Sequence, residues 1–179
     1  KMIKVPDGIA HFLEHKMFEQ EDGMDPFEFF AQSGTGCNAS TSYKVTKYYF
    51  SGNDKIYENL GYLINYVNSP YFTDENVEKE KGIICEEINM LQDNPEWFAE
   101  EEMQRMLYQK HNFRIPIAGT CESVRTITKE DLYNTYNAFY NPNNMHLLIG
   151  GDIDVDKVMD VIKSNKKLKY RQISRLTQK

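Results

Sequence analysis

Apolar residues recur along this chain at spacings of three and four, which is the spacing of one buried helix face. The clearest example begins at Asp54 and ends before Pro70. Its apolar face consists of Ile56, Leu60, Leu63, Ile64 and Val67. Together with capping signals, the same pattern predicts helices over about 8–20, 25–34, 54–69, 73–93, 96–110, 128–140 and 154–164.

Three shorter stretches have the composition of strands. Residues 37–42 and 45–52 lie close together, and the second is rich in β-branched and aromatic residues. Residues 145–149 form a short apolar stretch closed by Gly150 and Gly151, which predicts a third strand. Because strands and helices do not alternate strictly, we expect an α+β fold, with helices packed on one face of a sheet.

Several residues mark where helices begin. Asp7 precedes the first predicted helix as a candidate N-cap, and Asp25 precedes Pro26, which suits the first helical position. Thr128 precedes an acidic first turn. The polar tail from residue 165 receives no element, so we predict one domain over 1–164 and a tail or linker over 165–179.

Composition narrows the possible functions. A chain of 179 residues with 40% hydrophobic residues suits one globular domain, and the net charge of −6 argues against nucleic-acid binding. Three cysteines without a C-x-x-C pair favour a reducing, cytoplasmic setting. No run is apolar enough for a membrane span, and no signal segment opens the chain. The start is unlike a natural N-terminus, so we expect upstream sequence to be missing.

The pentapeptide His11-Phe12-Leu13-Glu14-His15 carries the most chemical information. Residues four apart share a helix face, so His11 and His15 can bind one zinc ion through imidazole nitrogens. Glu14 lies close to that face and can take a proton from a water activated by the metal. H-x-x-E-H is a known zinc-peptidase signature.

A catalytic zinc usually has a third protein ligand. His111 and His146 lack partners at ligand spacing, so a carboxylate is the better candidate. Glu80 and Glu87 stand two turns apart on the same side of the predicted helix over 73–93. A glutamate at the edge of the apolar face of this helix could enter the metal site. Glu78 and Glu86 are expected to point elsewhere.

These motifs resemble the pitrilysin/insulinase family of metallopeptidases. The pentapeptide after Gly8-Ile9-Ala10, then 37–42, then 77–81 with Glu86-Glu87, stand in the family's order. Ala118-Gly119-Thr120 and 140–145 also fit. The resemblance covers the chain up to about residue 164 and is strongest to bacterial zinc-dependent peptidases of this family. It implies a metalloenzyme domain of the mitochondrial-processing-peptidase/LuxS-like type.

The resemblance also implies roles for individual residues. It implies Zn²⁺ bound by His11, His15 and Glu87, with Glu14 as general base. Glu80 corresponds to a supporting glutamate that orients a ligand. Asn38 and Ala39 match an edge strand that holds an extended peptide by backbone hydrogen bonds.

The chain departs from the family in two respects. The 71 residues between His15 and Glu87 are slightly fewer than usual, which a shortened loop would explain. Family members also carry strands before the motif and close a chamber with a second half. We therefore expect a fragment whose partner is the C-terminal half of the same protein or a homologous subunit.

The leading hypothesis is a zinc-dependent endopeptidase acting on extended peptides or small proteins. One alternative is a non-catalytic scaffold or partner subunit of a peptidase-like complex. A second alternative is a zinc hydrolase or lyase that acts on a small molecule. A small closed pocket beside the metal would favour this alternative, whereas an open edge strand would favour a peptide substrate.

Overall fold

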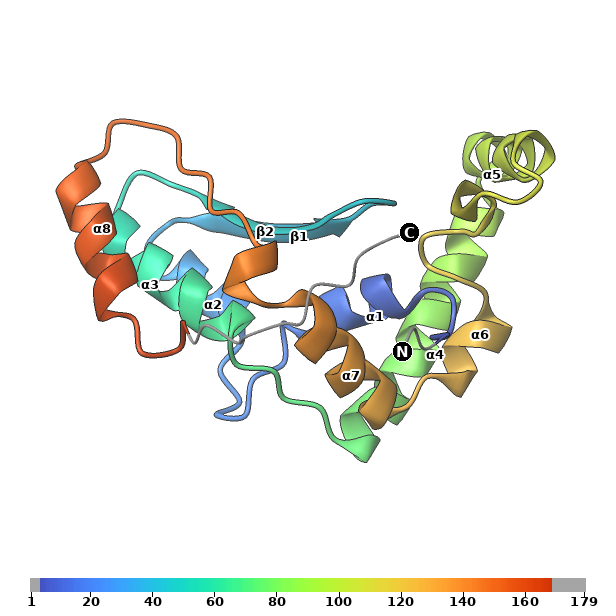
Figure 1. Ribbon diagram of the computed structural model, residues 1–179, viewed down its shortest axis with the longest axis horizontal. Coiled ribbons are helices and arrows are strands. Elements are labelled where there is room, and N and C mark those ends of the chain that lie inside the picture. Colours follow the sequence, from blue (N-terminus) through green and yellow to red (C-terminus); the bar gives the residue numbers. More distant parts are fainter. Residues whose placement is uncertain (1–3, 169–179) are drawn as a thin grey trace.

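The computed structural model describes residues 4–168, and these form helices around one hairpin (Figure 1). The elements in order are α1 (Ile9–Lys16), α2 (Pro26–Ala31), β1 (Gly36–Thr41), β2 (Thr46–Ser51), α3 (Ile56–Val67), α4 (Asp74–Gln92), α5 (Pro95–Leu107), η1 (Asn112–Arg114), α6 (Cys121–Thr126), α7 (Lys129–Phe139), η2 (Pro142–Asn144) and α8 (Val155–Ser164). The mixture of helices with a sheet confirms the α+β class.

The sheet is a two-stranded antiparallel hairpin. β1 and β2 pair from Gly36 opposite Ser51 to Thr41 opposite Thr46. The two strands fall on the stretches 37–42 and 45–52 that were predicted as strands. Alternate residues of each strand are partly buried, which gives the sheet one inner face and one exposed face. Helices α1, α2 and α3 contact the hairpin and lie on one side of it in Figure 1.

Three apolar clusters hold these helices together. The largest joins α1, α4, α6 and α7, and its members include Phe12, Ile84 and Leu132, all fully buried. A second cluster lies between α2 and α3, and a third between α3 and α8. The metal-binding motif predicted on α1 therefore lies on a helix whose other face is built into the main core.

Two glycines bring a distant loop against the start of α1. Gly8 has a φ of +89°, and a Cβ there would lie 2.3 Å from the Ala118 carbonyl oxygen. Gly119 has a φ of +75°, and a Cβ there would lie 2.5 Å from the Asp7 carbonyl oxygen. Only glycine tolerates both restrictions. Gly8 is also the N-cap of α1, so the prediction that Asp7 caps this helix was wrong.

The predicted strand over 145–149 was also wrong. These residues are neither helix nor strand, and Leu148 is 95% exposed. A strand forms by pairing its backbone with a neighbour, and β1 pairs only with β2 among the described residues. Met145 and Ile149 nevertheless pack against the second and third clusters, which accounts for the apolar character of the stretch.

Helix boundaries were predicted with mixed success. The helices expected over 54–69, 73–93, 128–140 and 154–164 appear as α3, α4, α7 and α8 with small shifts. Helix α1 is shorter than the predicted helix over 8–20, because it ends at Lys16. The six-residue helix α6 was not predicted. The predicted tail falls on 165–168, which follow α8 as turn and coil, and on 169–179, which lie outside the described residues.

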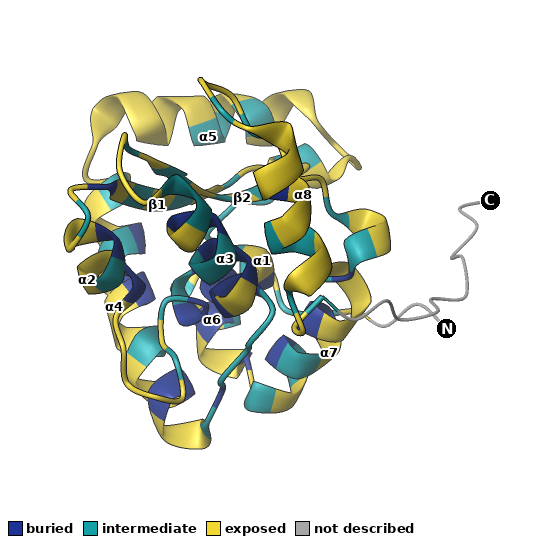
Figure 2. Cartoon of the chain, turned by 90° about the vertical axis from the view of Figure 1, so that its left-hand side faces the viewer, coloured by how far each residue is buried: buried dark blue, intermediate teal, exposed yellow. Residues whose placement is uncertain are grey.

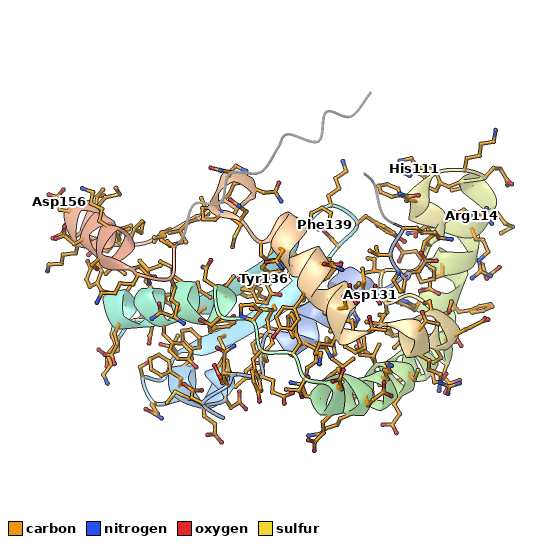
Figure 3. The ribbon with its side chains drawn as sticks, turned by 60° about the horizontal axis from the view of Figure 1, so that its bottom comes forward. His111, Arg114, Asp131, Tyr136, Phe139 and Asp156 are labelled. Carbon is orange, nitrogen blue, oxygen red and sulfur yellow. The ribbon has the colours of Figure 1, made fainter. Side chains whose placement is uncertain are left out.

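Helix α5 differs from the others because it buries none of its residues. It runs along the edge of the molecule in Figure 2, where it is almost entirely coloured as exposed. Its main contacts are with η1 and with α4, and Gln104 accepts a hydrogen bond from the Tyr43 hydroxyl. Figure 3 shows His111 and Arg114 at this end, opposite Asp156 on α8. Among the described residues, no helix combines the length and the apolarity needed to cross a membrane.

Candidate metal centre

Helix α1 separates its packing face from its polar face. Ile9, Phe12 and Leu13 are buried at helical spacing. His11 and His15, one turn apart, lie on another side with ring centroids separated by 4.5 Å. The core therefore fixes the rotation of α1 about its axis, and this rotation aims both imidazoles at α4.

Helix α4 places one carboxylate against both rings. Glu87 Oε1 lies 3.5 Å from His11 Nε2, and Glu87 Oε2 lies 3.4 Å from His15 Nε2. One ligand atom from each of the three residues lies within 4.8 Å of the others. The helix reaches this position because Val77, Ile84 and Ile88 of its apolar face pack in the core that also holds α1.

These separations fit a zinc ion. Ligand atoms bound tetrahedrally at about 2.0–2.1 Å from zinc lie roughly 3.3 Å from one another. The distances from His11 to Oε1 of Glu87 and from His15 to Oε2 are close to that value, and one ligand atom of each residue lies within 4.8 Å of the other two. Two nitrogens and one carboxylate oxygen are also a donor set typical of catalytic zinc, which leaves a coordination position for water. The residues present therefore fit the metal.

Glu80 contacts the far side of the His15 ring. Its Oε1 lies 3.0 Å from His15 Nδ1, so the ring can donate its Nδ1 proton there and present Nε2 to Glu87. Burial lowers the pKa of His15, but the hydrogen bond with Glu80 and the carboxylates around it outweigh this effect, and the pKa is raised.

Lys16 supports Glu80 from the side away from His15. The Lys16 side chain is 1% exposed, and its ammonium forms an ion pair with Glu19 and lies 3.6 Å from Glu80 Oε2. Burial raises the pKa of Glu80, but the hydrogen bond from His15 and the charge of Lys16 lower it overall. Glu80 is thereby kept ionised, so that both of its oxygens can accept hydrogen bonds from His15 and Lys16.

His11 lies in a drier environment than His15. Burial, and then the nearby His15, lower the pKa of His11. A lowered pKa favours the neutral imidazole, which is the form that binds a metal. The buried Nδ1 of His11 has no hydrogen-bond partner among the described residues, so Nε2 is the nitrogen engaged with Glu87.

Glu14 lies beside the three ligand residues without joining them. It is 8% exposed, and its Oε2 accepts a hydrogen bond of 2.5 Å from the hydroxyl of Thr41. Burial raises the pKa of Glu14, although the hydrogen bond from Thr41 opposes the shift. A carboxyl with a raised pKa is suited to taking up and releasing a proton.

Asn38 and Ala39 lie on β1, opposite Tyr49 and Tyr48. Ser42 bonds to Val45 across the turn, so the even-numbered residues of β1 direct their backbone groups to β2. The backbone of Ala39 therefore faces the free edge, where the Asn38 side chain accepts its N–H at 2.8 Å. β1 has an unpaired edge among the described residues, and its last residue, Thr41, touches Glu14.

Sequence reasoning missed two residues of this neighbourhood. Lys16 and Thr41 contact Glu80 and Glu14, respectively, yet neither was proposed for the site. Thr41 had one available signal, because it lies within the 37–42 stretch by which the family was recognised. Lys16 follows the pentapeptide directly, but a lysine near a helix end ordinarily reaches solvent. His111, by contrast, accepts the Phe113 N–H at the start of η1, and its ring contacts those of Tyr108 and Phe113.

Comparison with models of protein families shows which family this chain belongs to. Residues 4–121 match the family model described as insulinase (peptidase family M16), and residues 126–171 match the model described as peptidase M16 inactive domain. The chain belongs to the insulinase family. The resemblance inferred from the sequence motifs is thus confirmed.

Relatives in this family are named as zinc proteases. The chain is 48% identical over 165 residues to the uncharacterized zinc protease YmfH of Bacillus subtilis, covering 92% of this chain and 38% of the relative. An M16-like peptidase from Alicyclobacillus acidocaldarius has a crystal structure that matches with a TM-score of 0.92 at 49% identity, covering 96% of this chain and 41% of that one.

A second solved structure, at lower sequence identity, has the same fold over this chain. The periplasmic protease PqqL from Escherichia coli matches with a TM-score of 0.76 at 28% identity, covering 96% of this chain and 21% of that one. The chain thus spans well under half the length of each of these relatives.

Proposed function

We propose that this chain is the zinc-binding part of a metalloendopeptidase that cleaves extended peptides. The observation that carries the proposal is the convergence of His11, His15 and Glu87 at zinc-ligand spacing, with Glu14 adjacent. When bound, zinc would polarise a peptide carbonyl and make a water molecule more acidic. The names of the relatives support this reading.

Each of the site residues has its own role in this proposal. His11, His15 and Glu87 would hold the ion, and Glu80 would orient His15 through its Nδ1. Glu14 would accept a proton from the attacking water and deliver it to the leaving amine. Its burial and raised pKa favour both transfers, because the carboxyl can carry the proton between them.

The free edge of β1 would hold the substrate. Asn38 and Ala39 lie on this strand, and the backbone groups of Cys37, Ala39 and Thr41 face outward from the hairpin by the same alternation. An extended peptide that adds to this edge as a further strand would run past Glu14, because Thr41 contacts that residue. The arrangement favours a peptide over a small molecule enclosed in a pocket.

The rest of the peptidase would come from outside this chain. The chain spans 38% of YmfH, so we propose that the C-terminal half of the same protein, or a homologous subunit, completes the substrate chamber. A reducing, cytoplasmic setting is part of the proposal, since all three cysteines are free.

The test is the Glu14→Gln variant of the full-length natural protein that contains this chain. The variant should bind one zinc ion per chain and lose peptide hydrolysis by about 10²-fold or more, because the amide cannot take up the proton. Glu86→Gln is the matched control, since Glu86 is exposed on α4 beside Glu87. Wild-type cleavage by Glu14→Gln would refute the base, and absence of bound zinc would favour the scaffold alternative.

A further inference from the structure

A chain of hydroxyl groups leads from the interior to Glu14. The Thr41 hydroxyl lies 2.5 Å from Glu14 Oε2 and 3.2 Å from the Thr46 hydroxyl on the facing strand. Tyr140, the C-cap of α7, interacts through its hydroxyl with Thr46, and this hydroxyl lies 2.7 Å from that of Tyr48. Residues from β1, β2 and the end of α7 thus meet behind one carboxylate oxygen.

The direction of every hydrogen bond in this chain follows from one fact. An ionised carboxylate only accepts, so Thr41 must donate to Glu14. A hydroxyl has one proton to donate, so Thr46 must donate to Thr41, and Tyr140 must donate to Thr46. By the same step, Tyr48 donates to Tyr140. Four hydroxyls therefore point the same way, and aligned hydrogen bonds of this kind strengthen one another.

The two phenols remain donors over the working range of a peptidase. Burial, followed by the nearby Tyr140, raises the pKa of Tyr48 well above its usual range. Burial likewise raises the pKa of Tyr140 to about 12, although the hydrogen bond that it accepts from Tyr48 opposes the shift. Both hydroxyls therefore keep their protons at neutral pH.

The hydrogen bond from Thr41 also determines which oxygen of Glu14 is available. Oε2 is engaged by Thr41, while Oε1 has no hydrogen-bond partner among residues 4–168. Since Glu14 is held at Oε2, its carboxylate has a defined rotation, and Oε1 is the oxygen left to meet a water.

We propose that Thr41 is a positioning residue for the general base Glu14, held in its donating orientation by Thr46, Tyr140 and Tyr48. This inference rests on the proposed peptidase function. It assigns a role to the end of β1 and to the residue at the start of the 140–145 stretch, both of which served only to recognise the family. It also explains why an aromatic residue at the end of α7 lies against the hairpin.

The experiment compares Thr41→Val with Thr41→Ser in the longest natural protein that contains this chain. Valine keeps the shape and removes the donor, so kcat should fall by about 10- to 100-fold, the loss expected for a hydrogen bond to a charged group. The KM should change by less than about twofold, and bound zinc should remain at one ion per chain. Serine restores the donor and should keep kcat within about threefold of wild type. Thr126→Val on α6 is the control for loss of a threonine hydroxyl elsewhere.

Tyr140→Phe tests the more distant part of the chain without altering β1. The ring remains and only the hydroxyl is lost, so kcat should fall by about threefold, less than in Thr41→Val, because Thr41 still reaches Glu14. Tyr133→Phe is the matched control, since its hydroxyl accepts the Phe72 N–H away from Glu14. This variant also gives an answer if Thr41→Val does not fold.

The outcomes separate the two proposals. If Glu14→Gln abolishes turnover but Thr41→Val and Tyr140→Phe keep wild-type kcat, the positioning role is wrong and the peptidase proposal stands. If Thr41→Ser loses as much activity as Thr41→Val, the hydroxyl is not what matters and the inference also fails. If the Glu14→Gln variant cleaves at the wild-type rate, Glu14 is not the general base, and the positioning role of Thr41 is then also wrong.

Discussion

Helices α1 and α5 differ in how much of their surface is packed against the rest of the molecule. Helix α1 has eight residues, of which five are buried, and the two histidines between them face α4. Helix α5 has thirteen residues and buries none. The apolar residues of α1 fix its rotation and so aim His11 and His15, whereas Met103, Met106 and Leu107 of α5 remain at least half exposed.

A helix that is packed in the core holds the side chains of its other face in fixed positions, whereas an exposed helix does not. A metal centre needs side chains held within a fraction of an ångström, and burial of the opposite face supplies that restraint. The site thus lies where α1 and α4 share a core. The following predictions test this contrast, beginning with the largest expected effect.

Phe12→Ala should destabilise the fold by about 3–5 kcal/mol, because the ring is fully buried in the main cluster and its removal leaves a cavity. Urea unfolding followed by circular dichroism measures the loss. The affinity for zinc should fall as well, since the same core sets the rotation of α1. A change below about 1 kcal/mol would show that α1 is not held by its packing.

Glu80→Gln should weaken zinc binding by about 10- to 100-fold, the usual effect of removing a partner that orients a metal-binding histidine. The amide keeps the size of the carboxylate but lacks its charge, and it leaves the buried Lys16 with Glu19 alone. A competition titration with a zinc chelator measures the affinity. Glu78→Gln on the exposed side of α4 serves as control, and equal affinities in both variants would exclude the orienting role.

Ala39→Pro should raise the KM for an extended peptide by about 3- to 10-fold, the value of one backbone hydrogen bond. Proline removes the N–H that faces the free edge of β1 and leaves the pairing with β2 intact. Steady-state kinetics with one peptide measure the change, and zinc content should stay constant. An unchanged KM would place the substrate on another surface.

Met106→Ala should change the free energy of unfolding by less than about 0.5 kcal/mol, because this side chain of α5 is 69% exposed. The same urea titration used for Phe12→Ala provides the value. A loss of 2 kcal/mol or more would mean that α5 is packed in solution and that the contrast with α1 is smaller than described.

The same contrast explains what the sequence could predict. The pentapeptide and the helical spacing of α1 and α4 are local signals, so His11, His15 and the pair Glu80 and Glu87 could be proposed from residue patterns. The orientation of Glu14 depends on Thr41, which contacts it directly, and on Tyr140, which acts through Thr46, and these groups come together only in the folded chain. No local pattern encodes such a meeting.

The failed predictions have a similar origin. The stretch over 145–149 has the composition of a strand, but a strand also needs a partner with unpaired backbone groups, and composition does not report one. Asp7 has the side chain of an N-cap, yet the close approach of the loop at Gly119 moves the helix start to Gly8. Both errors arise from contacts between residues distant in the chain.

Anomalous scattering at the zinc edge tests the central claim most directly. In crystals of the protein grown with zinc, we predict one peak between the imidazoles of His11 and His15 and the carboxylate of Glu87. No peak at that position, or a zinc ion bound elsewhere with Glu87 directed away from both imidazoles, would contradict the account.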